Sequence, residues 1–413
     1  MRKTIRYLSV LLALASVFLF AAFFYADYSL SDNYIVVEGT QLEPGCQIPI
    51  TLEYEGEEAS QKTFTAEEAK TDYNVNFKLL GVFPVGSANV SVVSPMSVRV
   101  IGEPFGIKIY TDGVMVVKTE DVDGKDGSVN PSKRAGVRIG DTIKSINGKR
   151  VYSNEDVAGI VEESNGKALK LKILRNGTEI DVKIKPVYSE RSGIYRLGIW
   201  VRDSTAGIGT LTFYSPTENV VCGLGHGVCD SDTKELLSVS FGEIVNADIV
   251  AKRKGAAGDP GELKGRLTDV VLGDIVSNND RGVYAKAQTD FCDCQLMEIA
   301  VKQEITNGPA YIYTTIDGET PQYYTCNVEI RKNYLGDKTH NMTVTVTDAA
   351  LLSETGGIVQ GMSGSPIIQN GKLIGAVTHV LIDDPTKGYA IFAENMLETA
   401  QSVAEEKKLK EAS

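Results

Sequence analysis

Short apolar runs alternate with polar and glycine-rich links along most of the chain, and this pattern favours strands over helices. Residues 7–26 differ, because they are apolar except for two serines and as a helix would span roughly 30 Å. The end of the chain differs too, because from Ala393 its apolar residues follow helical spacing. These residues are Met396, Leu397, Ala400 and Val403. The pattern predicts a mostly β protein with one apolar helix at its start and one core-docked helix at its end.

The first apolar run has the flanks of a membrane anchor. Arg2, Lys3 and Arg6 precede it and Asp27 follows it, which orients the N-terminus to the cytoplasm and the body outside. The alternative is a cleaved signal peptide. Cleavage after Ala26 would need a small residue at position −3, where Phe24 stands. We therefore expect residues 1–26 to be a cytoplasmic stub and an uncleaved transmembrane anchor.

Size and charge narrow the possible classes. A chain of 413 residues with 42% hydrophobic content can bury more than one core, so two or three domains are expected. The formal net charge of −12 argues against nucleic acid as a partner, because binding phosphates needs clustered Lys and Arg. Residues 27–100 hold short apolar segments between Gly, Pro and acidic runs, which predicts a small membrane-proximal β segment without catalytic residues.

Residues 101–187 contain several specific signals. Ser153 and Asp156 form a capping box that opens a helix, and Asn176-Gly177 predicts a tight hairpin. The block resembles a PDZ domain, which implies that an extended peptide adds as a strand to a sheet edge and that its end meets free N–H groups in a loop. We place that loop at Phe105, Gly106 and Ile107. The alternative is a structural spacer whose groove is occluded.

Residues 356–380 contain the best candidate for a nucleophile. Gly361 and Gly364 flank Ser363 and allow a tight turn in which the N–H groups of Gly361 and Ser363 point at one oxyanion. A hairpin around Asn370-Gly371 would then hold the loop rigid. The pattern predicts Ser363 as a nucleophile, with Gly361 and Ser363 as the oxyanion hole.

A serine hydroxyl needs a base, and imidazole is the usual one near neutral pH. The chain has three histidines. His226 is flanked by glycines that free its ring, His340 lies in a polar stretch typical of a solvated loop, and His379 follows the hairpin on a strand expected to contact substrate or to pack. We choose His226 as the base.

The third member should be a carboxylate that holds the imidazole in one tautomer. Asp348 ends a strand-like run just before the nucleophile loop. The residues alone leave the choice open, and its rivals are Asp230, Asp232, Asp383 and Asp384.

The six cysteines offer a metal site only superficially. Cys222, His226 and Cys229 with Cys292-x-Cys294 match no standard zinc finger, so we expect no metal and no other cofactor. Buried free thiols are the simpler interpretation, with Cys46 standing alone near the membrane.

The order of an anchor, a PDZ domain, a Gly-His-Gly segment and the loop around Ser363 is similar to the stage IV sporulation protein B peptidases of spore-forming bacteria. The resemblance implies Ser363 as nucleophile, His226 as base and Asp348 as orienting acid. It also implies a single-pass protein of the inner forespore membrane, whose body faces the intermembrane space. Such a peptidase trims a protein that regulates a membrane-embedded processing protease, and so triggers maturation of a late mother-cell sigma factor. It also cleaves itself near the N-terminus, which would release the body.

The chain order His226, Asp348, Ser363 independently resembles chymotrypsin-like proteases, so we expect residues 188–413 to form a two-barrel β serine peptidase domain. An α/β-hydrolase is disfavoured because Ser365 stands where a nucleophile elbow needs glycine. The competing hypothesis is an anchored PDZ scaffold with a vestigial protease domain. A metal-dependent hydrolase is a third reading.

Overall fold

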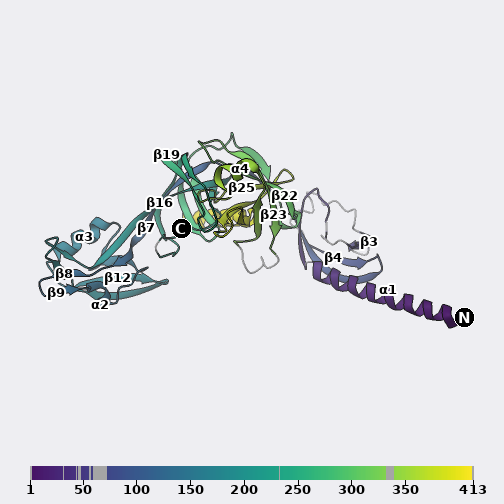
Figure 1. The fold of residues 1–413 in the computed structure, drawn as a ribbon, viewed down its shortest axis with the longest axis horizontal. Helices are drawn as coiled ribbons and strands as arrows, with labels where there is room; N and C mark the ends of the chain where they lie inside the picture. Colours follow the sequence, from purple (N-terminus) through teal and green to yellow (C-terminus); the bar gives the residue numbers. More distant parts are fainter. Residues whose placement is uncertain are drawn as a thin grey trace. The chain divides into compact units, whose positions relative to one another are not determined.

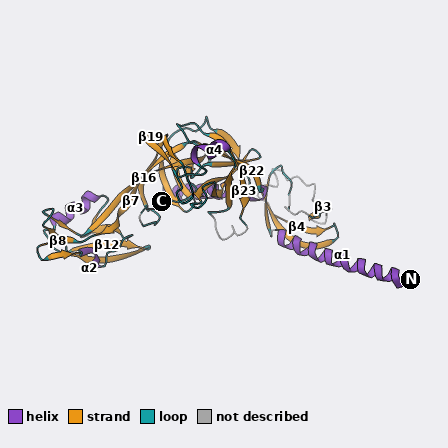
Figure 2. Ribbon diagram, in the orientation of Figure 1, coloured by secondary structure: helices purple, strands orange, loops and turns teal. Residues whose placement is uncertain are grey.

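The structure is a computed structural model, and it describes residues 2–30, 32–42, 44, 48–54, 57–58, 72–231, 233–331 and 339–411. Cys46 and Asp232 lie outside these residues. The chain folds into two compact units, Met1–Ser97 with Glu298–Thr306, and Val98–Met297 with Asn307–Ser413. Strands predominate in the second unit (Figure 2), as the alternating pattern predicts.

The first unit consists of a long helix and a five-stranded sheet. Helix α1 (Arg2–Ser29) holds the one segment in the described chain that is long and apolar enough to cross a membrane, Val10–Ser29. The last turns of α1 also pack into the core of this unit, because Ala26 is fully buried among sheet residues such as Phe77 and Val90. The sheet order is β1 (Asn33–Val37), β5 (Phe83–Val93), β4 (Asp72–Leu79), β2 (Ile50–Tyr54) and β3 (Glu57–Glu58).

The second unit contains two six-stranded barrels. In the first barrel each strand pairs with the next and the last returns to the first, which closes the ring. Phe105, Leu211 and Val283 lie in its core. In ring order its strands are β7 (Pro104–Thr119), β18 (Val239–Arg253), β19 (Glu262–Asn279), β20 (Gly282–Ala287), β17 (Val220–Gly223) and β16 (Ile199–Ser215).

The second barrel is also closed, and it carries the segment around Ser363. Asn370 and Gly371 both have positive φ, of 52° and 77°, which confirms the expected hairpin turn. The two-barrel architecture expected from the sequence is thereby confirmed. In ring order the strands are β22 (Gly308–Thr314), β23 (Gln322–Ile330), β24 (Met342–Val346), β27 (Lys387–Phe392), β26 (Lys372–Val380) and β25 (Pro366–Gln369).

A PDZ module is inserted between β7 and β16, the two strands of the first barrel that come first in the sequence. Figure 1 shows β7 and β16 running side by side from the barrel into this module. Their barrel ends pair Gly106 with Ile208, and their module ends pair Thr119 with Ile199. The boundaries expected at residues 101 and 187 therefore differ from the structure, because both long strands belong to the barrel and to the module.

The module has its own apolar core, which includes Val116, Ile143 and Ile173. Ser153 caps α3 in a capping box with Asp156, as predicted, and Asn176-Gly177 forms a turn with positive φ at both residues. Its further elements are β8 (Val122–Gly124), β9 (Gly127–Val129), α2 (Pro131–Ala135), β10 (Thr142–Ile146), β11 (Lys149–Arg150), α3 (Asn154–Glu163), β12 (Leu169–Arg175), β13 (Thr178–Ile184), β14 (Val187–Ser189) and β15 (Ile194–Arg196).

The C-terminal helix α5 (Ala393–Glu411) packs beside both barrels, and its residues Met396 and Ala400 are fully buried, as the apolar stripe predicts. Helix α4 (Ala349–Thr355) leads into the nucleophile loop. The remaining elements are β6 (Ser97–Val100), β21 (Gln295–Glu298) and η2 (Lys302–Glu304).

Candidate active site

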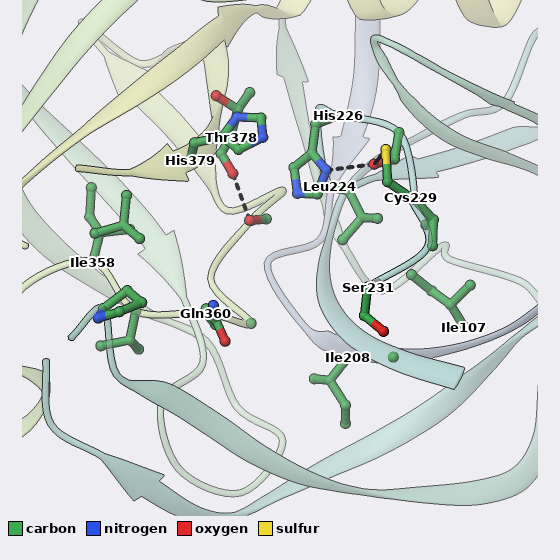
Figure 3. Close-up of a pocket in the computed structure, with 18 of the residues that line it drawn as sticks. Ile107, Ile208, Leu224, His226, Cys229, Ser231, Ile358, Gln360, Thr378 and His379 are labelled. Atoms are coloured by element: carbon green, nitrogen blue, oxygen red, sulfur yellow. Dashed lines mark hydrogen bonds between the residues drawn. The ribbon is translucent and has the colours of Figure 1, made fainter. Parts of the chain in front are cut away.

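Ser363 and His226 line one pocket of about 550 Å³ in the two-barrel unit. His226 comes from the segment that follows β17 of the first barrel, whereas Ser363 precedes β25 of the second. The two residues are 137 positions apart in the sequence (363 − 226), yet the fold brings them together. Figure 3 shows His226 and His379 on one side of this pocket and Gln360 and Ile208 on another.

Backbone hydrogen bonds fix the nucleophile loop in place. The N–H of Thr210, on β16, donates to the carbonyl of Ser363 at 2.9 Å, and the N–H of Gly364 donates to Val377 at 2.7 Å. The hydroxyls of Thr210 and Thr212 donate to the carbonyls of Gly361 and Gly364. The first barrel thus holds the loop that presents the serine of the second barrel.

Gly364 is needed where it stands. Its φ is +95°, and an added Cβ would lie 1.9 Å from the carbonyl oxygen of Thr210. Only glycine allows this close approach without displacing the strand.

The loop leaves two N–H groups without an acceptor. Gln360, Met362, Gly364 and Ser365 all donate to backbone carbonyls, at 2.7 to 3.3 Å. Within the described chain, the N–H groups of Gly361 and Ser363 have no such acceptor. A pair of unoccupied donors on alternate residues of a rigid loop is the arrangement that an oxyanion hole needs.

His226 faces a carbonyl rather than a carboxylate. Its Nδ1 lies 2.9 Å from the oxygen of Gly227, and because a carbonyl can only accept, this contact places the proton on Nδ1 and leaves Nε2 free to accept one. Burial lowers the pKa of His226 below its ordinary value, the Gly227 contact opposes this, and His340 adds to it. A neutral imidazole with a free Nε2 is suited to act as a base.

The hydroxyl of Ser363 does not reach that imidazole here. It donates to the carbonyl oxygen of Thr378 at 2.6 Å, the bond drawn as a dashed line from Thr378 in Figure 3. Rotation about one side-chain bond would free it, so the structure has the character of a resting state.

All three histidines gather at this site. The ring of His379 lies 4.5 Å from that of His226 and 5.2 Å from that of His340, centroid to centroid. Loss of hydration, and then these two rings, lowers the pKa of His379 to about 4, although part of its ring faces solvent. The expectation that His379 borders the cleft agrees with this placement, whereas His340, expected in a solvated loop, has no sequence signal for its position beside the other rings.

Asp348 is not among the residues that line the pocket of His226 and Ser363, and its side chain caps a helix. It is the N-cap of α4, where its Oδ1 accepts from the N–H groups of Ala350 and Leu351 while Oδ2 accepts from Thr325. The pattern of an Asp before a helix could have indicated this role. In the described part of the chain no carboxylate accepts from His226.

Two of the rival carboxylates, Asp230 and Asp384, are also occupied. Asp230 lines the pocket but pairs with Arg202, and Asp384 accepts from Thr386. The third member of the expected triad is therefore not among the contacts of the base.

Phe105, Gly106 and Ile107 do not form a PDZ peptide-binding loop. They lie within β7 inside the first barrel, where Gly106 is paired on both sides, with Ile208 and with Val245. A Cβ on Gly106 would lie 1.5 Å from the side chain of Leu267, so this glycine serves close packing. The apolar-Gly-apolar pattern fits a barrel strand as well as a loop, which is why the sequence interpretation was wrong.

The cysteines divide between core and surface. Cys222 and Cys326 are buried, and burial raises the pKa of the Cys326 thiol to about 12. Cys229, Cys292 and Cys294 are more accessible, so the expectation of buried thiols holds for two of the five described. Among the described residues, no group of three His, Cys, Asp or Glu side chains is placed to hold a metal ion.

The pocket wall beside the nucleophile loop is apolar. Ile358 and Val359 precede the oxyanion donors, Val380 ends β26, which carries Thr378, and Ile382 follows this strand. Pro260, from the β18–β19 hairpin of the first barrel, closes the same wall. Figure 3 shows Ile358 on the opposite side of the pocket from Cys229 and Ser231.

These features define a PDZ-containing serine peptidase. Two six-stranded barrels meet at a serine loop with free N–H groups and at a neutral imidazole, and a PDZ module accompanies them. Comparison with known families agrees. Residues 193–397 match the SpoIVB peptidase S55 family and residues 129–175 match the PDZ domain family. The chain belongs to the SpoIVB-like family of PDZ-containing peptidases.

Two curated relatives share short segments with this chain. One, from Clostridium acetobutylicum, is named as a zinc metalloprotease and is 34% identical over 76 residues, which are 18% of this chain and 22% of the relative. The other, from Lactococcus lactis, carries the same description and is 31% identical over 84 residues, 20% of this chain and 19% of the relative. The chain thus spans about a fifth of the length of the curated relatives it matches.

Among solved structures, the Rv3671c protease of M. tuberculosis in its active form aligns with 47% of this chain and 72% of its own, at 17% identity and a TM-score of 0.28. The PDZ domain of an SdrC-like protein from Listeria monocytogenes aligns with 22% of this chain and 87% of its own, at 22% identity and a TM-score of 0.18.

Proposed function

We propose that this protein is a serine endopeptidase in which Ser363 is the nucleophile and His226 the general base. Ser363 Oγ attacks the scissile carbonyl while His226 Nε2 takes its proton, and the N–H groups of Gly361 and Ser363 bind the oxyanion. His226 then gives the proton to the leaving amine, and water hydrolyses the acyl-enzyme. The observation that carries this proposal is the pair of unoccupied N–H groups beside a serine that shares a pocket with a neutral imidazole.

The carbonyl of Gly227 takes the place of an orienting acid in this proposal. A hydrogen bond from Nδ1 to this carbonyl fixes the tautomer that leaves Nε2 unprotonated. Fixing this tautomer is the main role of the carboxylate in a catalytic triad. Asp348 acts at a distance, because it caps the helix that leads into the nucleophile loop.

The substrate that we propose has an apolar residue before the scissile bond. Ile358, Val359, Val380 and Ile382 make the wall nearest the nucleophile loop apolar, and a charged side chain there would lose its hydration without gaining a partner. The likeness to the stage IV sporulation protein B peptidases supports a finer role as well. We propose a signalling peptidase that cleaves a protein regulating a membrane-embedded processing protease during sporulation.

We propose that α1 anchors the protein in the inner forespore membrane with the body in the intermembrane space. The burial of Ala26 in the core of the first unit supports an uncleaved helix, because removal of residues up to 26 would open that core. Self-cleavage near the N-terminus would then release the peptidase unit.

The PDZ module offers its peptide-binding edge at Ile199–Asp203 of β16 rather than at Phe105–Ile107. There β16 pairs with β7 on one side, and on the other side no strand of the described chain pairs with it. Helix α3 lies beside this edge, and Asp203 accepts a hydrogen bond from the N–H of Asn154 at the start of α3. An extended peptide can add to such an edge as a further strand.

Labelling with a fluorophosphonate tests the catalytic proposal. The wild-type protein should be labelled at Ser363, and Ser363→Ala should lose labelling and lower peptide turnover by about six orders of magnitude. Coexpression of anchored Ser363→Ala protein with the active soluble body tests cleavage in trans. If Ser363→Ala leaves labelling and cleavage unchanged, the peptidase proposal is lost and an anchored peptide-binding scaffold remains.

A further inference from the structure

Strand β16 contacts both the nucleophile loop and the segment that follows His226. At one end of β16, Ile199–Asp203 forms the exposed edge of the PDZ module. At the other end, Thr210 and Thr212 hold the nucleophile loop. Arg202, which belongs to the first of these ends, reaches the segment that follows His226.

The contact of Arg202 with that segment is an ion pair in which the carboxylate is buried and the guanidinium is partly exposed. Its Nη1 lies 2.5 Å from Oδ2 of Asp230, whose side chain is 0% exposed, and Nη1 also donates to the hydroxyl of Ser231 at 3.0 Å. The other oxygen of Asp230 accepts from the N–H of Thr233 at 2.9 Å. A carboxylate buried this completely depends on its cation, because removing one partner leaves an uncompensated charge in the interior.

Asp230 organises the loop that carries the base. Residues 227–231 and 233–237 belong to one compact turn, in which the N–H of Asp230 donates to the carbonyl of Glu235 and the carbonyl of Asp230 accepts from the N–H of Lys234. The turn is fixed at its neck, where Asn278 bonds both the N–H and the carbonyl of Val228. His226 lies directly before this neck, so the position of its ring follows the turn.

The PDZ module contacts the same turn at two further places. The hydroxyl of Thr233 lies 3.5 Å from Sδ of Met115, on the module end of β7. The carboxylate of Glu235 lies so close to Gly140 that an added Cβ there would be 3.0 Å from it. The turn after His226 is thus packed against the module on one side and lines the active-site pocket on the other.

We propose that Arg202 and Asp230 are positioning residues, which hold His226 where its Nε2 can take the proton of Ser363. Because Arg202 belongs to the edge beside α3, a peptide that adds to this edge acts on the base through the ion pair. The module is then a regulatory part of the active site rather than a tether for substrate. The inference rests on the proposed peptidase function.

Arg202→Met and Asp230→Asn test the pair, with kcat and KM for a peptide substrate and the rate of fluorophosphonate labelling as readouts. Each variant should lower kcat and the labelling rate by roughly 100-fold, the cost of misplacing a catalytic group by about 1 Å, with little change in KM. The double variant should be no worse than either single one, because the two residues act as a unit. Hydrogen exchange should rise in residues 226–237.

Arg175→Met is the matched control. Arg175 pairs at 2.7 Å with Asp141, a carboxylate that is 1% exposed, and this ion pair bonds to Arg138 and Gly136 of the PDZ module, whereas the turn meets the module at the neighbouring Gly140. The control should keep kcat within about threefold, since a pair that shares no hydrogen-bond partner with the turn couples weakly to it. Arg202→Lys keeps the charge and should restore part of kcat, and melting curves show that each variant is folded.

Three outcomes would overturn the inference. In the first, the losses of the single variants multiply in the double variant; in the second, Arg175→Met lowers kcat as much; in the third, only KM changes. If Arg202→Met fails to fold, the neutral double variant decides, and wild-type kcat in it with unchanged hydrogen exchange contradicts the role. Absence of labelling at Ser363 in the wild-type protein would instead refute the peptidase function itself.

Discussion

The two sides of the active site are built in different ways. The nucleophile loop is held by main-chain hydrogen bonds and threonine hydroxyls, and its oxyanion donors already stand free. The base precedes a turn that has main-chain hydrogen bonds of its own but is tied to its surroundings by the amide side chain of Asn278 and by the ion pair of Asp230 with Arg202. In the described chain the hydroxyl of Ser363 donates to Thr378 rather than to the imidazole. Main-chain bonds to β16 make the nucleophile side rigid, whereas side chains make the attachment of the base side adjustable. Regulation is therefore expected to act on His226 rather than on Ser363.

The strongest way to break the rigid side is Gly364→Ala. The new methyl would lie 1.9 Å from Thr210 O and 2.5 Å from Leu224 N, so the loop must leave β16. We expect a loss of at least about 100-fold in fluorophosphonate labelling. Gly371→Ala is the control, because its φ is also positive, at +77°, but its Cβ meets nothing within 4 Å. It should cost about 1 kcal/mol of strain and keep labelling.

The apolar wall predicts substrate preference. Peptides with Leu before the scissile bond should exceed those with Gly by about 10- to 100-fold in kcat/KM, which corresponds to burying one Leu side chain. Peptides with Asp at this position should be the poorest. A series of quenched fluorescent peptides measures this, and a preference for Lys or Arg would show that the pocket is used differently.

Substitutions of Asp348 distinguish two roles for its carboxylate, capping α4 and orienting His226. Asp348→Ala should cost about 1 kcal/mol of stability through loss of the cap on α4, as seen in a thermal or denaturant melt. Asp348→Asn should keep both stability and most activity, since Asn caps helices as well as Asp does. A loss of about 10⁴ in kcat for Asp348→Asn would mean that this carboxylate orients His226 in the active state.

The smallest effect concerns pH. A base must be neutral to act, so activity is lost as pH falls through the pKa of His226. Because burial lowers that pKa, the acid limb of the kcat/KM profile should lie below pH 6.5. His340→Gln removes a neighbour that lowers the pKa, so the limb should move up, by less than about one pH unit. A limb that moves down would contradict the arrangement of the three rings.

Local signals in the sequence predicted local structure well. The capping box at Ser153, the turns at Asn176-Gly177 and Asn370-Gly371, and the buried stripe of the last helix all stand as expected, because each depends on neighbouring residues. The order of motifs led to the family and to the two-barrel fold. Ser363 and His226, which line one pocket, were singled out by their glycine-bounded loops, and their catalytic roles stay a prediction.

What failed depended on contacts between distant segments. Gly106 reads equally as a loop or as a strand until Ile208 and Val245 are known to pair with it. The insertion of the PDZ module is visible only in the pairing of β7 with β16, about 90 residues later. Asp230 was weighed as an acid for the triad, yet its partner Arg202 comes from a strand that no local pattern connects to it.

The insertion of the PDZ module has a practical result for anyone who wishes to exchange or delete it. Because the chain enters the module through β7 and leaves it through β16, the module has two covalent attachments to the barrel. A simple truncation would therefore remove strands from the first barrel. A graft would have to be spliced near the paired residues Tyr110 and Ser204, where the two strands leave the barrel. By the same geometry, a force on the module would be carried to the first barrel by both strands at once.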